Sequence, residues 1–410
     1  MEEKGKLTLK NGVDVYWVHY PSRTSTYGEI HVCSGSVDDP YDKRGLAHFV
    51  EHMTFHGSKR YQSRHKQEAR ARELGFEERL NGGTNAVCIK YPFCVKTENV
   101  ASALEFLNDL IFSPIFRSVD VDHERRIIAD ESRRNSDQID SKVYSLFYQT
   151  FYRGTPLEEL PLGREDHIDS FARGDVVNFH RKHFHSGNTR LYLSGNMENT
   201  LGKLEDAFSD IASKKPFPPF KLSLPILASD QIYEHRIQGL RECYGNILFR
   251  APECHLADSP ALVVVSELLN DSKRFGLMEN IRHKLGLAYG IGSNYNRNVG
   301  AGGYFNVGFS CGPKDLEKVR EEMRRLTLSV NPSQSELDSA KKRLLQRYAA
   351  GDNDQGERFS QFVVESTTPF SFKKDKEETA ALSRKQVVDA VEKYLINQPS
   401  QTLLVVPQKS

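Results

Sequence analysis

The sequence lacks the features that mark membrane-bound, nucleic-acid-binding or disulfide-stapled proteins. Its 410 residues contain six cysteines, none in a C-x-x-C pair, which gives no sign of a disulfide framework. Lysine and arginine total 56 against 55 acidic residues, so the net charge of +1 gives no reason to expect a nucleic-acid partner. The aliphatic run 261–265 ends at Ser266, far short of the roughly 20 apolar residues of a membrane-spanning helix.

The start of the sequence gives no reason to expect an export signal. Residues 1–6 are mostly charged and contain no apolar core of the kind found in secretory signals. The unpaired cysteines favour a reducing compartment, where most of them would act as small buried hydrophobic residues. Together these absences predict a cytoplasmic protein without a membrane partner.

The composition is that of a globular protein large enough for more than one domain. Apolar residues make up 38% and charged residues 27% of the chain, which is typical of soluble domains. Residues 213–220 contain three prolines within four positions, which excludes a helix and favours an extended linker. We therefore expect a first domain over 1–212, a linker over 213–226 and a second domain over 227–410.

The two halves show the same order of expected elements. The strand pattern at 26–32 resembles that at 243–249, and both contain a Tyr-Gly pair. A long, charged helix is expected later in each half, over 118–134 and over 333–347. This faint repeat predicts an α+β fold of two similar domains related by duplication, each a mostly antiparallel sheet packed with helices.

The most informative motif lies on a helix expected over 41–56. His48 and His52 are four residues apart, so both imidazoles lie on one helix face and can reach one metal ion at about 2.0–2.1 Å. Glu51 lies beside them, where a carboxylate can contact a metal-bound water without being a ligand. This H-x-x-E-H pattern arises by chance in roughly 3% of such chains, so by itself it leaves open an ordinary polar helix surface.

A third metal ligand has to come from elsewhere in the chain. Glu124 and Glu131 are seven residues apart, two turns along one face of the expected helix 118–134. Because catalytic zinc usually has three protein ligands, Glu131 could complete the set while Glu124 could orient an imidazole. Without a metal, the same two acids would be a solvated helix surface.

The segment 45–61, which contains this motif, resembles the active-site helix of the inverzincin metallopeptidases. That family includes pitrilysin, insulin-degrading enzyme and the mitochondrial processing peptidases. The resemblance extends to 82–86, which is similar to the strand bordering the family's cleft, and to 282–289, which is similar to its Arg/Tyr signature. It implies a subunit that forms half of a clamshell and has two similar α+β domains.

The resemblance also implies a set of site residues. His48, His52 and Glu131 would hold one Zn²⁺ per subunit, Glu124 would orient a ligand, and Glu51 would be the general base.

Further residues would contact the substrate. Tyr289 would stabilise the oxyanion and Arg282 would anchor the substrate, while Asn85 and Ala86 would bind an extended peptide through the backbone. The resemblance includes single-chain relatives with two such halves in tandem, the zinc motif in the first and the Arg/Tyr motif in the second. This chain has the length of one half but carries both motifs, so we expect a homodimer in which Arg282 and Tyr289 complete the partner's site. A heterodimer with a paralogous subunit stays open.

The expected function is that of a zinc metalloendopeptidase, which hydrolyses peptides or unfolded segments inside a closed chamber. Two alternatives stay open. One is a dedicated protease that processes a precursor or leader peptide by the same chemistry. The other is a non-catalytic, peptide-binding subunit of the same fold, although such subunits tend to lose the ligands and the base that this sequence retains.

Overall fold

A computed structural model describes residues 3–222, 224, 227–297, 300 and 302–408. The chain forms two compact units. Unit 1 consists of Met1–Tyr148 and Pro156–Pro218, and unit 2 consists of Gln149–Thr155 and Pro219–Ser410.

The chain therefore passes between the units three times. The last passage, after Pro218, lies within the predicted linker 213–226, of which residues 223, 225 and 226 are outside the described part. The first two passages bring the short segment 149–155 into unit 2. The predicted boundary at 212 did not anticipate this exchange, because a helix that continues from one unit into the other shows no break in its sequence pattern.

Unit 1 is built on a six-stranded sheet with the order β1-β2-β6-β3-β5-β4. Among these neighbours β2 and β6 are parallel and the others are antiparallel. The strands are β1 (Glu3–Thr8), β2 (Asp14–His19), β3 (Ser25–Val32), β4 (Gly83–Thr84), β5 (Ile89–Lys96) and β6 (Thr189–Gly195).

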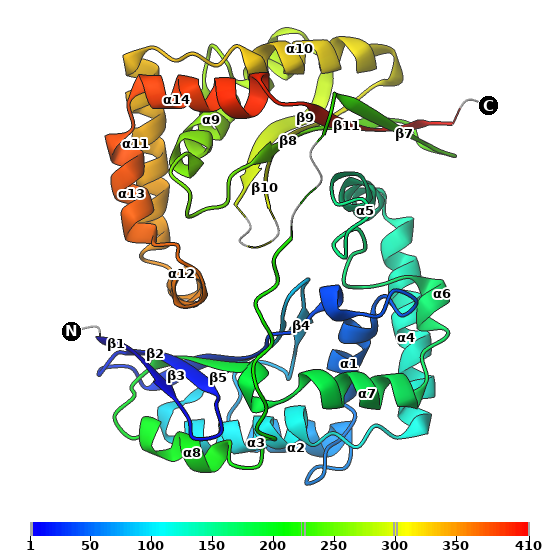
Figure 1. The fold of residues 1–410 in the computed structure, drawn as a ribbon, viewed down its shortest axis with the longest axis vertical. Helices are drawn as coiled ribbons and strands as arrows, with labels where there is room; N and C mark the ends of the chain where they lie inside the picture. The colour runs from blue at the N-terminus through cyan, green and yellow to red at the C-terminus, as the bar shows by residue number, and fades with distance from the viewer. Residues whose placement is uncertain (1–2, 223, 225–226, 298–299, 301, 409–410) are drawn as a thin grey trace. The chain divides into compact units, whose positions relative to one another are not determined.

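The helices of unit 1 lie between its strands in chain order, except for α8, which follows the last strand (Figure 1). They are α1 (Leu46–Thr54), α2 (Arg64–Glu73), α3 (Val100–Phe112), α4 (Ser118–Asp137), α6 (Glu165–Ile168), α7 (Arg173–His183) and α8 (Leu204–Ala207), with short turns η1 (Ser36–Asp38), η2 (Thr97–Asn99), η3 (Ser186–Asn188) and η4 (Leu201–Lys203). Helix α5 (Ile139–Phe151) begins in unit 1, and its last residues belong to unit 2.

One face of this sheet is buried because apolar residues alternate along its strands. In β3 every second side chain is buried, including Ile30 and Val32. Helices α1 and α3 cover this face, and Phe49 and Met53 of α1 are fully buried in the same core. The core thus fixes which face of α1 points inward, and the opposite face is left for polar side chains.

Unit 2 repeats the plan of unit 1 around a five-stranded sheet, β7-β11-β8-β10-β9, in which β7 and β11 are parallel. When β1 is left out, the two sheets have the same strand order: the first, fifth, second, fourth and third strands in the chain are neighbours in that sequence. The strands are β7 (Gln231–Ile237), β8 (Cys243–Ala251), β9 (Ala288–Asn296), β10 (Gly303–Cys311) and β11 (Ser400–Pro407). This shared topology confirms the predicted α+β fold of two similar domains.

The helices of unit 2 supply part of a separate core, which they share with the strands of its sheet. They are α9 (Ser259–Asp271), α10 (Leu316–Leu328), α11 (Gln334–Gly351), α12 (Gln355–Thr367), α13 (Phe372–Ala381) and α14 (Arg384–Val391), with η6 (Pro313–Asp315) and the π-helical segments η5 (Met278–Lys284) and η7 (Glu392–Ile396). None of the described helices in either unit is long and apolar enough to cross a bilayer.

The start of α1 is held by its surroundings. Asp39 accepts hydrogen bonds from the backbone N–H groups of Gly45 (2.8 Å) and Ala47 (2.7 Å), which have no partner within the helix. Gly45 has a φ of 98°, a backbone conformation that favours glycine. These two features start the helix at Leu46, whereas the apolar pattern predicted a start at residue 41.

The backbone of Gly163 packs directly against the residues that precede α1. Its φ is 77°, and a Cβ atom there would lie 2.4 Å from the Arg44 carbonyl oxygen and 2.5 Å from the Gly45 Cα. We expect Gly163→Ala to lower the free energy of unfolding of unit 1 by about 3 kcal/mol, since backbone strain and overpacking add. Thermal unfolding followed by circular dichroism measures the change.

Gly12→Ala is the matched control, because Gly12 also has a positive φ (101°) but the nearest atom to its added Cβ would be 3.7 Å away. It retains the backbone strain, about 1 kcal/mol, without the collision. Equal losses of stability in the two variants would contradict the proposed packing against the start of α1.

Candidate active site

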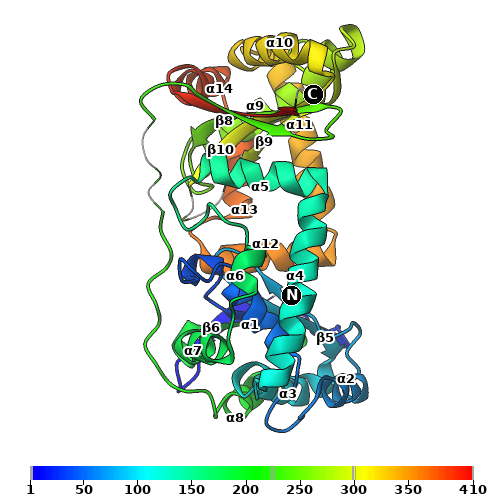
Figure 2. The same cartoon turned by 90° about the vertical axis from the view of Figure 1, so that its right-hand side faces the viewer.

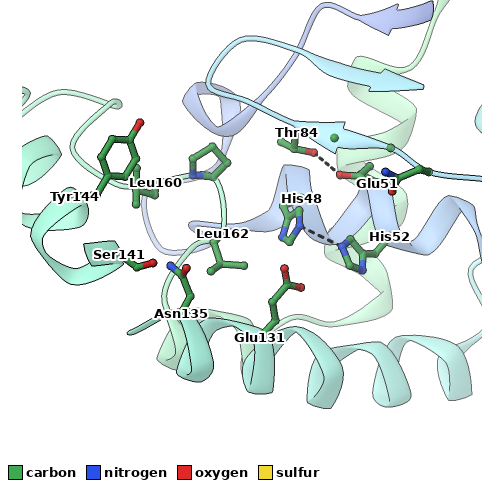
Figure 3. A pocket seen from close by; sticks show the side chains of 14 residues that line it. His48, Glu51, His52, Thr84, Glu131, Asn135, Ser141, Tyr144, Leu160 and Leu162 are labelled. Atoms are coloured by element: carbon green, nitrogen blue, oxygen red, sulfur yellow. Dashed lines mark hydrogen bonds between the residues drawn. The ribbon is translucent and has the colours of Figure 1, made fainter. Parts of the chain in front are cut away.

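Helix α1 directs two imidazoles at one point. The Nε2 atoms of His48 and His52 lie 3.1 Å apart, and their rings meet edge to face with centroids 4.5 Å apart (Figure 3). Because Phe49 and Met53 are buried on the opposite side, both histidines have to point away from the core. The helical spacing seen in the sequence therefore produces converging ring nitrogens.

Helix α4 supplies the third donor. It runs beside α1 (Figure 2), and its Glu131 side chain points toward the two imidazoles (Figure 3). The candidate ligand atoms of His48, His52 and Glu131 all lie within 4.8 Å of one another. The structure thus brings together the three residues that the sequence analysis expected to hold a metal.

Glu124 lies on the same helix as Glu131 and orients His52. Glu124 is buried, and its carboxylate accepts a hydrogen bond from His52 Nδ1 at 2.8 Å. Burial opposes the charged form, but the hydrogen bonds from His52 and His56 outweigh it and lower the pKa of Glu124 to about 2. Glu124 is therefore a carboxylate at neutral pH and leaves the Nε2 atom of His52 facing the site.

His56 is a site residue that the sequence analysis missed. Its Nε2 atom lies 2.6 Å from the second oxygen of Glu124. The signal was present in the spacing, because His56 follows His52 by four residues just as His52 follows His48. Its partner could not be identified from the sequence, since the contact joins residues 68 positions apart.

The two imidazoles differ in their affinity for protons. Burial and the nearby His52 charge lower the pKa of His48 to about 3, so His48 is neutral at physiological pH. Burial also acts to lower the pKa of His52, but the hydrogen bond with Glu124 and the charge of Glu51 outweigh it and raise that pKa. In the metal-free protein a protonated His52 can donate to both Glu124 and His48.

Glu51 is held next to this group by the β4 region. The residue is 4% exposed, and its carboxylate accepts a hydrogen bond from Thr84 Oγ1 at 3.0 Å. Gly82 lies against it, since a Cβ atom at residue 82 would be 2.6 Å from Glu51 Oε1. Burial raises the pKa of Glu51. The sequence pattern does not identify Thr84 as a site residue, because its contact with Glu51 depends on how β4 packs against α1.

A cavity of about 650 Å³ opens on these side chains. Its other walls come from α4, α5 and the loop before α6, and Figure 3 shows Tyr144 and Leu162 across from β4. The lining residues outside the polar group are Asn81, Gly82, Gly83, Thr84, Asn135, Ser141, Tyr144, Leu160, Pro161 and Leu162. The cavity therefore combines a polar centre with an apolar and aromatic wall.

Asn85 and Ala86, which the resemblance assigns to peptide binding, do not line this cavity. Their carbonyl oxygens accept hydrogen bonds from the N–H groups of Ser36 and Val37. The Asn85 side chain accepts from the N–H groups of the two residues at the end of its turn, Val87 and Cys88. In unit 1 the β4 residues just before them contact the cavity instead.

Arg282 and Tyr289 belong to unit 2. Arg282 lies in η5 and is exposed, with its guanidinium 3.8 Å from the Met278 sulfur. Tyr289 lies on the edge strand β9 and is 56% exposed. Both side chains are available to a ligand, and their roles toward the zinc motif stay predictions.

The protonation of His52 leads to a test of this site. A cation has to displace the His52 proton. The affinity of the site for the cation should therefore fall about tenfold for each pH unit below the pKa of His52. In Glu124→Gln the charge that raises this pKa is removed while burial persists, so the pKa should fall. A nuclear magnetic resonance titration of the His52 ring in the metal-free protein measures it.

Asp130→Asn is the control for this titration, because Asp130 is an exposed acid on the same helix. It should leave the pKa of His52 unchanged. The same pKa in wild type and Glu124→Gln would show that Glu124 does not control the imidazole.

The chain matches two descriptions of one protein family. The family description "Insulinase (Peptidase family M16)" matches residues 15–163, and "Peptidase M16 inactive domain" matches residues 170–344. A protein described as an uncharacterized zinc protease in Rickettsia felis is 26% identical over 344 residues, which cover 82% of this chain and 81% of that protein. The beta subunit of the mitochondrial-processing peptidase of Caenorhabditis elegans is 24% identical, covering 82% of this chain and 74% of that subunit.

Solved structures share the fold. A protease from Helicobacter pylori superposes with a TM-score of 0.87 at 19% identity, covering 99% of this chain and 100% of that one. The first half of the periplasmic protease PqqL from Escherichia coli gives 0.81 at 17% identity, covering 99% and 92%. With matches to both family descriptions, which together span most of residues 15–344, the chain belongs to the M16 peptidase family, the pitrilysin-type inverzincins.

Proposed function

We propose that this protein is a zinc-dependent endopeptidase that hydrolyses peptides or unfolded segments. The observation that carries the proposal is that three converging donors and a fourth carboxylate, Glu51, share one cavity. A non-catalytic subunit would not need Glu51 to be held in place by Thr84 and Gly82.

The residues present fit a zinc ion. Two imidazole nitrogens face each other at 3.1 Å, and one carboxylate lies near both, which is the His₂Glu donor set of catalytic zinc. When bound, zinc would lower the pKa of a water molecule to about 7 and polarise the scissile carbonyl.

The two buried glutamates have different roles because their environments move their pKa values in opposite directions. Glu124, with a pKa of about 2, stays charged and orients His52. Burial raises the pKa of Glu51, which makes its carboxylate a stronger base than an exposed one. In the reaction Glu51 takes the proton of the attacking water and passes it to the leaving amine.

Strand β4 supports peptide binding beside Glu51. It is the last strand of its sheet, and Gly83 and Thr84 line the cavity. An extended peptide can add to such an edge through backbone hydrogen bonds, which gives affinity without a strict sequence preference. This geometry suits unfolded segments rather than folded proteins.

A dedicated processing enzyme is the second candidate, because one relative is a subunit of a mitochondrial-processing peptidase. It would use the same residues and the same chemistry on a single precursor. Cleavage of a mixed peptide library, identified by mass spectrometry, separates the two: a general peptidase cuts many peptides, and a processing enzyme cuts few.

Glu51→Gln tests the proposed base. Since glutamine cannot accept a proton, we expect the rate of peptide hydrolysis to fall about 10³-fold. The metal content, measured by mass spectrometry, should stay near that of the wild type because Glu51 is not a ligand. Removal of metal by a chelator should abolish wild-type hydrolysis, and zinc should restore it. Hydrolysis by the Gln variant at the wild-type rate would rule out Glu51 as the base.

A homodimer is the second part of the proposal, with Arg282 and Tyr289 of one subunit completing the zinc site of the other. Two variants, Glu131→Gln and Tyr289→Phe, should each lose most activity. When they are refolded together, mixed dimers should contain one intact site and recover activity, up to about a quarter of wild type for random pairing. Mixtures that stay inactive would show that the two motifs do not act across subunits.

A further inference from the structure

The buried carboxylate of Glu124 is shared by two imidazoles, of which only one belongs to the expected metal ligands. Oε1 is 2.8 Å from His52 Nδ1, and Oε2 is 2.6 Å from His56 Nε2. The side chain of His56 is 13% exposed and that of Glu124 is 3% exposed, so water has little access to the pair. His56 thus contacts the oxygen of Glu124 that is not bonded to His52.

His56 is also fixed through its backbone. It follows the last turn of α1, where its N–H donates to the Met53 carbonyl at 3.3 Å. Its carbonyl accepts a hydrogen bond from Arg117 Nη2 at 3.2 Å, and Arg117 immediately precedes α4. His56 therefore connects the end of α1 with α4 at two points, the start of α4 and Glu124.

This connection bears on the position of the third donor. Glu131 follows Glu124 by seven residues, about 10.5 Å farther along the same helix. A shift or rotation of α4 relative to α1 would therefore move Glu131 away from the imidazoles while also turning Glu124 away from His52. The hydrogen bond with His56 opposes both movements.

We propose that His56 is a positioning residue, which holds the Glu124 carboxylate and the α1–α4 spacing so that His52 and Glu131 can share one cation. The inference rests on the proposed function only for the identity of that cation as zinc. Without His56, Oε2 of Glu124 would be a buried acceptor that has lost its partner, and the carboxylate would turn or admit water. The guanidinium of Arg117 is no substitute, since it bonds to Asp120, the His56 carbonyl and the Gln62 carbonyl.

Substitutions of His56 that differ in reach test this role. The amide nitrogen of His56→Gln can occupy the position of Nε2 and donate to Glu124, whereas the shorter side chain of His56→Asn cannot reach it. His56→Ala removes the donor altogether. The control is His123→Ala, which removes an exposed imidazole next to Glu124 on α4.

Zinc affinity of the metal-free proteins, measured by competition with a chromophoric chelator, is the primary readout. We expect about tenfold weaker binding in His56→Ala and His56→Asn, and binding within about threefold of wild type in His56→Gln and His123→Ala. Wild-type affinity in His56→Ala, or equal losses in His56→Gln and His56→Asn, would overturn the proposal. If thermal unfolding shows that His56→Ala does not fold, the zinc affinities of His56→Gln and His56→Asn test the proposal.

The outcome is separable from that of the proposed function. If wild-type protein binds zinc but cleaves no peptide in the library, the peptidase proposal fails while the affinity comparison still tests His56. If peptides are cleaved and His56→Ala retains wild-type zinc affinity, the positioning role fails and the peptidase proposal stands.

Discussion

The candidate site depends on the contact between α1 and α4. Two imidazoles come from one helix and the third donor from the other, so neither helix can form the group alone. The contact contains a buried carboxylate, Glu124, which is stable in its charged form because two imidazoles donate to it. A polar interaction of this kind specifies one arrangement of the two helices, whereas apolar packing would tolerate small shifts.

The rest of unit 1 holds the elements of this contact in place. Asp39 and the paired glycines at residues 45 and 163 set where α1 begins. The buried apolar face of α1 sets its rotation, and Thr84 holds Glu51 on its remaining side. Close packing therefore leaves the side chains of the candidate site little freedom to move.

Unit 2 shows what the same topology does without a metal motif. Helix α9 follows β8 as α1 follows β3, but α9 carries no histidine. Its buried Glu267 is paired with Arg343 and Arg347 of α11, so the acid stabilises helix packing. A duplicated fold thus provides the same helix position for the candidate metal site in one unit and for a structural ion pair in the other.

The sequence by itself determined the chemistry of the site, because helical periodicity is local: residues four or seven apart on α1 and α4 share a face in any context. It also indicated the repeated α+β plan. Only the tertiary structure decided which distant groups meet. Thr84 contacts Glu51 across 33 positions and His56 contacts Glu124 across 68, while the Asn85 and Ala86 carbonyls pair with Ser36 and Val37. Such contacts depend on the packing of whole elements, which no local pattern specifies.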